Sequence, residues 1–163
     1  MDIYAYLKKD HRLVKELMKQ VLATEDRRQH ERLFEKINAE LGLHADTEEK
    51  TFYTELKQKG GRHLQEKEDH AEEEHDEIRH YLHKLGAADI DSPEWLVAFG
   101  GLKHAVEHHI EEEEGEIFEK AKKVIPEGRA KALAREMEAL KQQKKGKLKQ
   151  DQADQHILER MTV

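Results

Sequence analysis

The sequence predicts an all-α protein in which an antiparallel up-down-up-down four-helix bundle is followed by an additional C-terminal helix. Apolar residues recur at helical spacing through most of the chain. Helix breakers are rare, with two prolines and nine glycines in 163 residues. The 40% charged and 36% hydrophobic composition is typical of long helices with one buried face. This length suits one domain, which we expect to consist of the bundle over 1–125 and a C-terminal helix and tail over 126–163.

The first two helices are predicted over about 3–23 and 29–59. In each helix, apolar side chains three and four positions apart share one face. These are Tyr4, Leu7, Val14, Met18 and Val21 in the first helix, and Phe34, Ile37, Leu41, Phe52 and Leu56 in the second. Gly60 and Gly61 end the second helix.

The third and fourth helices are predicted over about 62–85 and 93–124. Gly86 ends the third, Ser92 caps the fourth with Pro93 at its first position, and Pro126 follows its end. A fifth amphipathic helix over about 127–145 is predicted to pack across the bundle or to mediate association. Periodicity is weak over 150–163, a segment that can fray and to which we assign no structure.

The composition excludes several classes of function. Without cysteine, the chain has no disulfide, thiol nucleophile or thiolate metal ligand. A net charge of −7 disfavours nucleic acid as a partner, although Lys141 to Lys149 form a local basic stretch. The sequence has neither a signal-peptide pattern nor 18 consecutive apolar residues, so we expect a cytoplasmic protein without a membrane partner.

Histidines on the apolar faces indicate a metal site. Each of the four predicted bundle helices carries one, and two of them begin HxxxE pairs, in which the side chains lie one above the other on the helix. The six residues are His11, His44, Glu48, His75, His109 and Glu113. A bundle would bring them into one interior layer, where imidazoles and carboxylates need partners or a cation.

The helical phase separates these residues from neighbouring polar ones. At about 100° per residue, His104 and His108 turn away from the face of His109, and His75 is preferred over His70, His80 and His83. Only Glu113 of the run Glu111 to Glu114 points inward. His30 lies too far along its helix to join His44. The alternative is a polar network of buried His and Glu that fixes helix register without metal.

Two segments that begin at His44 and His109, HADTEEKTFY and HIEEEEGEIF, match each other and suggest two pseudo-repeated halves. Together with DHRLV around His11 and EEHDEI around His75, they resemble the hemerythrin-like, or HHE cation-binding, domain over about residues 1–123. The resemblance implies a four-helix bundle with two iron ions joined by an oxo or hydroxo bridge. In it, the four histidines would be terminal ligands, and Glu48 and Glu113 would bridge the ions. Zinc and manganese are also compatible with nitrogen and oxygen donors.

The sequence departs from oxygen-carrying hemerythrins. It lacks their additional third-helix histidine in an HxxxH pair, because Ala71 and Arg79 stand four residues from His75, and it has Glu113 where they use aspartate. About two coordination positions of two octahedral irons are thus left for water, an exogenous ligand or a further side chain. The candidates for that side chain are Glu74, His70 and His104.

Three function classes remain open at this level. The first is a diiron protein that binds or senses O2 or NO, or takes part in handling iron under oxidative stress. The second is a diiron enzyme that reduces O2 or peroxide. The third is a structural or interaction bundle without a functional metal, in which the basic stretch contacts an unidentified protein partner. No residue pattern marks a substrate pocket or a catalytic group beyond the metal site, so enzyme status stays open.

Overall fold

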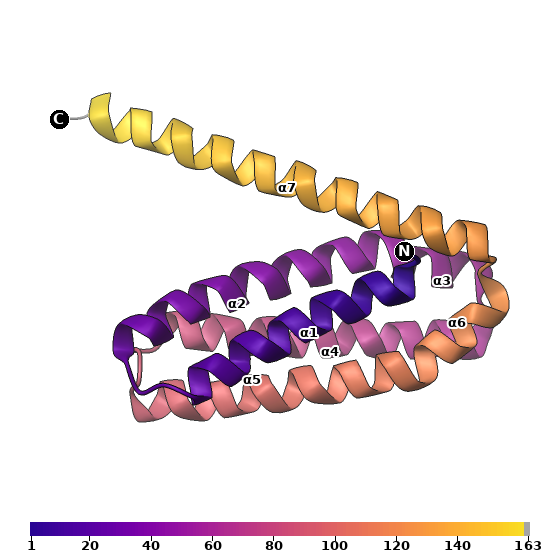
Figure 1. Ribbon diagram of the computed structural model, residues 1–163, viewed down its shortest axis with the longest axis horizontal. Coiled ribbons are helices and arrows are strands. Elements are labelled where there is room, and N and C mark those ends of the chain that lie inside the picture. Colours follow the sequence, from indigo (N-terminus) through magenta and orange to yellow (C-terminus); the bar gives the residue numbers. More distant parts are fainter. Residues whose placement is uncertain (162–163) are drawn as a thin grey trace.

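The computed structural model describes residues 1–161, and these form helices without a β-strand. In chain order, the elements are α1 Ile3–Leu22, α2 Arg27–Glu48, η1 Glu49–Tyr53, α3 Thr54–Lys59, α4 Arg62–Ala87, α5 Pro93–Glu112, η2 Glu113–Ile117, α6 Phe118–Val124 and α7 Glu127–Met161. The long helices α1, α2, α4 and α5 lie side by side, and α7 lies against α1 and α2 (Figure 1). The all-helical prediction is confirmed.

Side-chain caps begin three of the bundle helices. The side chains of Asp2, Asp26 and Ser92 accept hydrogen bonds from backbone N–H groups in the first turns of α1, α2 and α5. Pro93 occupies the start of α5, where its missing N–H costs no hydrogen bond. The expected helix starts are therefore close to those observed.

The second and fourth predicted helices each contain a π-helical segment, which the sequence reasoning did not anticipate. The segment η1 follows Glu48 directly, and η2 begins at Glu113. Both segments therefore start at the glutamate of an HxxxE pair or at the next residue. A π-helical turn takes one residue more than an α-helical turn, so it changes which later side chains face the interior.

The core consists of two hydrophobic clusters. One contains Val14, Ile37, Leu82, Phe99 and Leu102, and the other contains Leu7, Phe52, Phe118, Leu133 and Met137. The buried histidines and glutamates belong to neither cluster and occur on the same helices. Burial of these apolar side chains, each worth about 1.5–3 kcal/mol, stabilises the arrangement that holds the polar residues inside.

Helix α7 extends well beyond the predicted fifth helix. It continues to Met161, whereas the prediction placed its end near 145 and assigned no structure to 150–163; residues 162–163 lie outside the described part. Its buried residues are Ala130, Leu133, Ala134, Met137 and Lys141. The described residues after Lys141 are exposed except Lys144, and toward its C-terminal end the helix diverges from α2 (Figure 1). Local helical bonding, rather than packing, therefore maintains its last turns.

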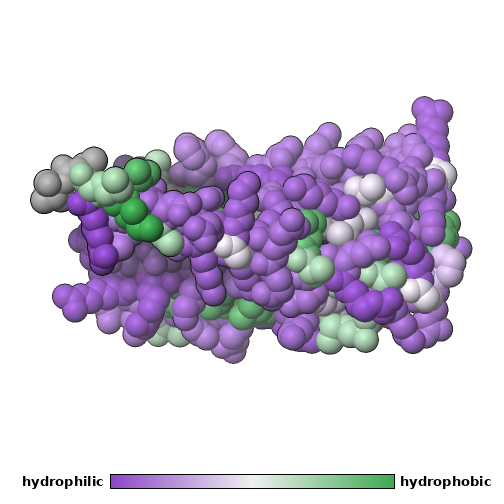
Figure 2. Space-filling model, turned by 90° about the horizontal axis from the view of Figure 1, so that it is seen from above, coloured by the Kyte–Doolittle hydropathy of each residue, from purple (hydrophilic) through white to green (hydrophobic). Residues whose placement is uncertain are grey.

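The visible surface is mostly hydrophilic, with hydrophobic residues beside the C-terminal end of α7 (Figure 2). The exposed hydrophobic side chains of that end are Ile157, Leu158 and Met161. Among the described residues, none of the helices is long and apolar enough to cross a membrane.

Candidate metal centre

The six predicted residues meet inside the bundle. His11 comes from α1, His44 and Glu48 from α2, His75 from α4, His109 from α5, and Glu113 from the first position of η2. All six are at most 5% exposed. Their donor atoms form two overlapping groups, each with atoms within 4.8 Å of one another: His11, His44, Glu48 and Glu113; and Glu48, His75, His109 and Glu113.

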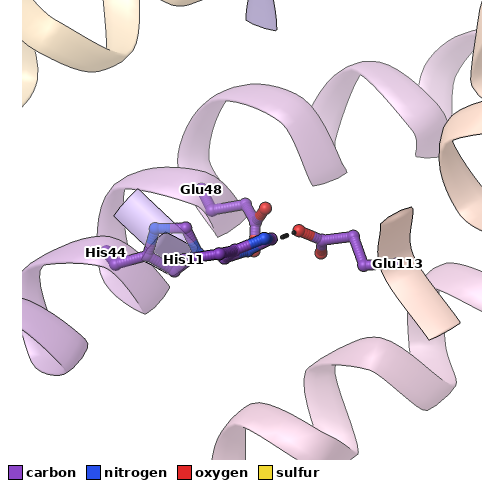
Figure 3. A group of neighbouring side chains, drawn as sticks. All are labelled: His11, His44, Glu48 and Glu113. Carbon is purple, nitrogen blue, oxygen red and sulfur yellow. Dashed lines mark ion pairs between the residues drawn. The ribbon is translucent and has the colours of Figure 1, made fainter. Parts of the chain in front are cut away.

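The two glutamates lie between histidines of different helices. Glu48 Oε1 is 3.5 Å from His44 Nε2 and 3.1 Å from His75 Nε2. Glu113 places Oε1 3.2 Å from His11 Nε2 and Oε2 3.3 Å from His109 Nε2. Figure 3 shows the first group. Glu113 approaches His11 from one side, and His44 and Glu48 lie on the other side. Both carboxylates belong to both groups, which is the arrangement that two bridged cations require.

Unpartnered buried atoms test whether these residues fit a metal. His11 Nε2, His44 Nε2, both carboxylate oxygens of Glu48 and Glu113 Oε1 are buried and form no hydrogen bond with suitable geometry. Leaving such groups unpaired is costly, at about 1–3 kcal/mol each and more when charged. Because these atoms face one another within the two groups, the donor set fits a pair of cations.

Each histidine is oriented by a carboxylate on its other ring nitrogen. The Nδ1 atoms of His11, His44, His75 and His109 pair with Glu114, Asp10, Glu49 and Glu74 at 2.7, 2.7, 2.7 and 2.9 Å, respectively. This leaves every Nε2 directed at the interior. Histidine ligands of metals characteristically have such a second partner, which fixes the ring and raises its basicity.

The supporting carboxylates correct one expectation from the sequence and give a role to one candidate residue. Glu114, assigned to a solvated face, contacts His11 and is only partly exposed. Glu74, a candidate further ligand, accepts a hydrogen bond from His109 through Oε1. His70 and His104, the other two candidates, lie at the exposed surface. Helical phase alone missed Asp10, Glu49 and Glu114 because each is adjacent to a predicted ligand or bridge and so appears to face away.

Tyr53 enters the centre, a position that the apolar spacing and the six predicted donors did not indicate. It is 0% exposed, and its hydroxyl donates to Glu113 Oε2 at 2.6 Å and lies 3.4 Å from Nε2 of His75 and of His109. In a regular α-helix, Tyr53 would point about 140° away from Glu48. The π-helical segment that ends at Tyr53 turns this side chain back toward the same interior.

The electrostatics of the metal-free centre are dominated by its carboxylates. Burial opposes protonation, but the charge of Glu48 and the hydrogen bond to Asp10 raise the pKa of His44 to about 10. In the same way, Glu113 overcomes burial and raises the pKa of His109 to about 10. Despite its burial, Glu113 has a pKa well below its usual value because of His109 and His11. Without metal, the centre is therefore an internal ion-pair network.

A small cavity of about 20 Å³ borders all four histidines. Its remaining lining is Asp10 and the mostly apolar side chains of Val14, Leu41, Ala45, Ile78, Val106 and Ile110. This volume accommodates a molecule about the size of water and excludes a larger organic substrate. His30 is remote from the cavity, as predicted, and pairs with the carbonyl oxygens of Val21 and Thr24.

Comparison with known proteins agrees with this geometry. A family model described as the hemerythrin HHE cation binding domain matches residues 2–121. The chain belongs to the hemerythrin HHE cation-binding domain family. The region matched by the family model contains all six residues of the two donor groups, which could hold a metal ion.

A solved relative supports the fold of the HHE domain and of the helix that follows it. It is the crystal structure of a hemerythrin HHE cation binding domain-containing protein from Mycobacterium kansasii, with a TM-score of 0.77 and 23% identity. The match covers 90% of this chain and 89% of that one. No curated protein sequence matches the chain.

Proposed function

We propose that this HHE domain binds two iron ions through His11, His44, Glu48, His75, His109 and Glu113, with the two glutamates shared between the ions. The observation that carries the proposal is the set of buried, unpartnered nitrogen and oxygen atoms that face one another in two overlapping groups. Family membership supports a cation, typically iron, whereas zinc and manganese also accept such donors. We also propose that the four bundle helices run alternately up and down, as the sequence predicts.

We infer that the centre binds or senses a small ligand such as O2 or NO, or takes part in iron and oxidative-stress handling. Iron would supply a redox-active site with affinity for such ligands. The protein would supply a cavity whose size and apolar walls admit small molecules and limit water. Apart from the histidines, Asp10 is the polar residue that lines the cavity, and its carboxylate accepts a hydrogen bond from His44. A cytoplasmic location remains an expectation.

A diiron enzyme that reduces O2 or peroxide is the second candidate. The buried Tyr53 hydroxyl favours it, because this group is a hydrogen-bond donor placed inside the centre. Turnover of peroxide well above that of an equal amount of free iron would support the enzyme. Stoichiometric ligand binding without turnover would support a binding or sensing role.

The test is metal content after expression in iron-replete medium, combined with absorption spectra of the reduced and air-exposed protein. We expect about two irons per chain, and loss of bound iron in His44→Ala and Glu48→Ala with helix content retained in circular dichroism. His80→Ala, an exposed change on α4, is the matched control. Iron content in His44→Ala equal to that of the unmodified protein would contradict the assignment, as would failure of the reduced apo protein to take up metal.

A further inference from the structure

A second group of histidines and carboxylates lies at the surface between α4 and α5. It repeats the HxxxE spacing of the buried centre, with His70 and Glu74 on α4 and His108 and Glu112 on α5. One donor atom from each of His70, Glu74 and Glu112 lies within 4.8 Å of the other two. His108 flanks this group, with Nε2 3.4 Å from Glu74 Oε2 and 3.1 Å from Glu112 Oε1.

The distances from His70 suit a shared cation better than direct hydrogen bonds. His70 Nε2 is 3.6 Å from Glu74 Oε2 and 3.5 Å from Glu112 Oε2, beyond the usual N–H···O range. Donors about 2.0–2.2 Å from a tetrahedral Zn2+ are roughly 3.3–3.6 Å apart, close to the spacings of His70. The side chains of His70, Glu74 and Glu112 therefore need little movement to become ligands.

Glu74 provides an independent indication that a ligand belongs here. The residue is 5% exposed, and its Oε2 is buried without a hydrogen-bond partner of suitable geometry. Its other oxygen is already engaged by His109 of the buried centre. The unpartnered oxygen faces His70 and His108, so a cation bound there would satisfy it.

We propose that His70, Glu74, His108 and Glu112 bind one divalent transition-metal ion, separate from the buried pair. Two imidazoles and two carboxylates suit Zn2+, Co2+ or Fe2+ better than Ca2+ or Mg2+, which prefer all-oxygen sites. Both histidines are more than half exposed, so the ion is accessible from solvent. Glu74 joins the two sites, because one of its oxygens faces this outer ion and the other holds His109.

The experiment is Co2+ binding by equilibrium dialysis, with visible spectra as a report on coordination. We expect His70→Ala/His108→Ala to bind one Co2+ per chain fewer than the unmodified protein and to lose the corresponding absorption. The control is His80→Ala/His83→Ala, which removes two exposed histidines from α4 and should bind as many ions as the unmodified protein. Equal stoichiometry and affinity in His70→Ala/His108→Ala and the unmodified protein would overturn the proposal.

A further variant separates this site from the buried one. His44→Ala/Glu48→Ala removes donors of the buried centre and leaves the surface group unchanged. Retention of one Co2+ in this variant, lost when His70→Ala/His108→Ala is added, supports the outer site whether or not the buried centre binds metal. Absence of any Co2+ in His44→Ala/Glu48→Ala, with the helix content retained, would contradict an independent outer site.

Discussion

Lys141 of α7 forms an ion pair with Asp10 of α1, although the lysine is only 5% exposed. Asp10 uses the same carboxylate to accept the hydrogen bond from His44 Nδ1 at 2.7 Å. The lysine also lies 4.7 Å from the centre of the Tyr6 ring. A helix outside the matched family region thus contacts the support of a proposed metal ligand.

Replacement of Asp10 by Asn should weaken metal binding at the buried centre. The amide is neutral, so it stabilises the metal-bound imidazole of His44 less than the carboxylate does. Loss of such a support typically costs about 10–100-fold in metal affinity, which competition with a chelator would measure. The exposed change Asp89→Asn should leave the affinity unchanged, and an equal loss in both variants would refute a specific role for Asp10.

Replacement of Lys141 by Met should destabilise the metal-free protein. The substitution removes the lysine cation that pairs with the Asp10 carboxylate. We expect the free energy of unfolding to fall by up to about 3 kcal/mol. This is the lower end of the range for breaking a buried ion pair, because Asp10 still pairs with His44. Lys141→Arg should recover most of this loss. Urea unfolding gives both values; identical stability of the Met and Arg variants would show that the charge is not needed.

Replacement of Tyr53 by Phe should keep the fold and remove the hydrogen bond to Glu113. Glu113 Oε2 would remain buried without this donor, at a cost of about 1–3 kcal/mol in the metal-free protein. Thermal unfolding followed by circular dichroism would measure the change. Tyr81→Phe, at a partly exposed position on α4, serves as the comparison and should change stability much less.

Metal binding to the buried centre should release protons and strengthen as the pH rises. The pKa values of His44 and His109, about 10 without metal, mean that both are protonated near neutral pH and must lose protons to act as ligands. An indicator dye in weak buffer would report the release at pH 8. Release by His44→Ala equal to that of the unmodified protein would argue against protonated His44.

The same pKa values predict how the stability of the metal-free protein changes with pH. Both pKa values are higher in the folded state than the unperturbed value of about 6.5. The two protonated histidines therefore contribute their full stabilisation of the folded state below about pH 6.5. It is lost as the pH rises toward about 10. Urea unfolding between pH 6 and 10 should therefore show falling stability, with a smaller decline in His44→Ala.

Two truncations should distinguish the contributions of the two halves of α7 to the stability of the protein. A chain ending at residue 145 keeps every buried residue of the helix, so its stability should change by no more than about 0.5 kcal/mol. A chain ending at residue 125 loses Leu133 and Met137, both 0% exposed. Loss of even one such side chain costs about 2–5 kcal/mol, so this chain should melt at a much lower temperature.

The sequence alone determined the helical fold and the set of residues that meets in the interior. Apolar spacing located the five helices, and helical phase selected one histidine in each bundle helix and two glutamates. This works because an α-helix fixes the direction of each side chain relative to its neighbours, and because a bundle has only one interior. The π-helical segments follow no comparable rule of spacing, and so the sequence did not predict the contact between Tyr53 and Glu113.

Only the tertiary structure decided which carboxylate supports each histidine and which helix contributes Lys141. The partners Asp10–His44 and Glu74–His109 lie 34 and 35 positions apart, and Lys141 is 131 positions from Asp10. Such contacts depend on the rotation and height of packed helices, which periodicity within one helix does not encode. The surface group that contains His70 and His108 also depends on tertiary packing. Each HxxxE pair lies within one helix, but the four donors come close together only because α4 packs against α5.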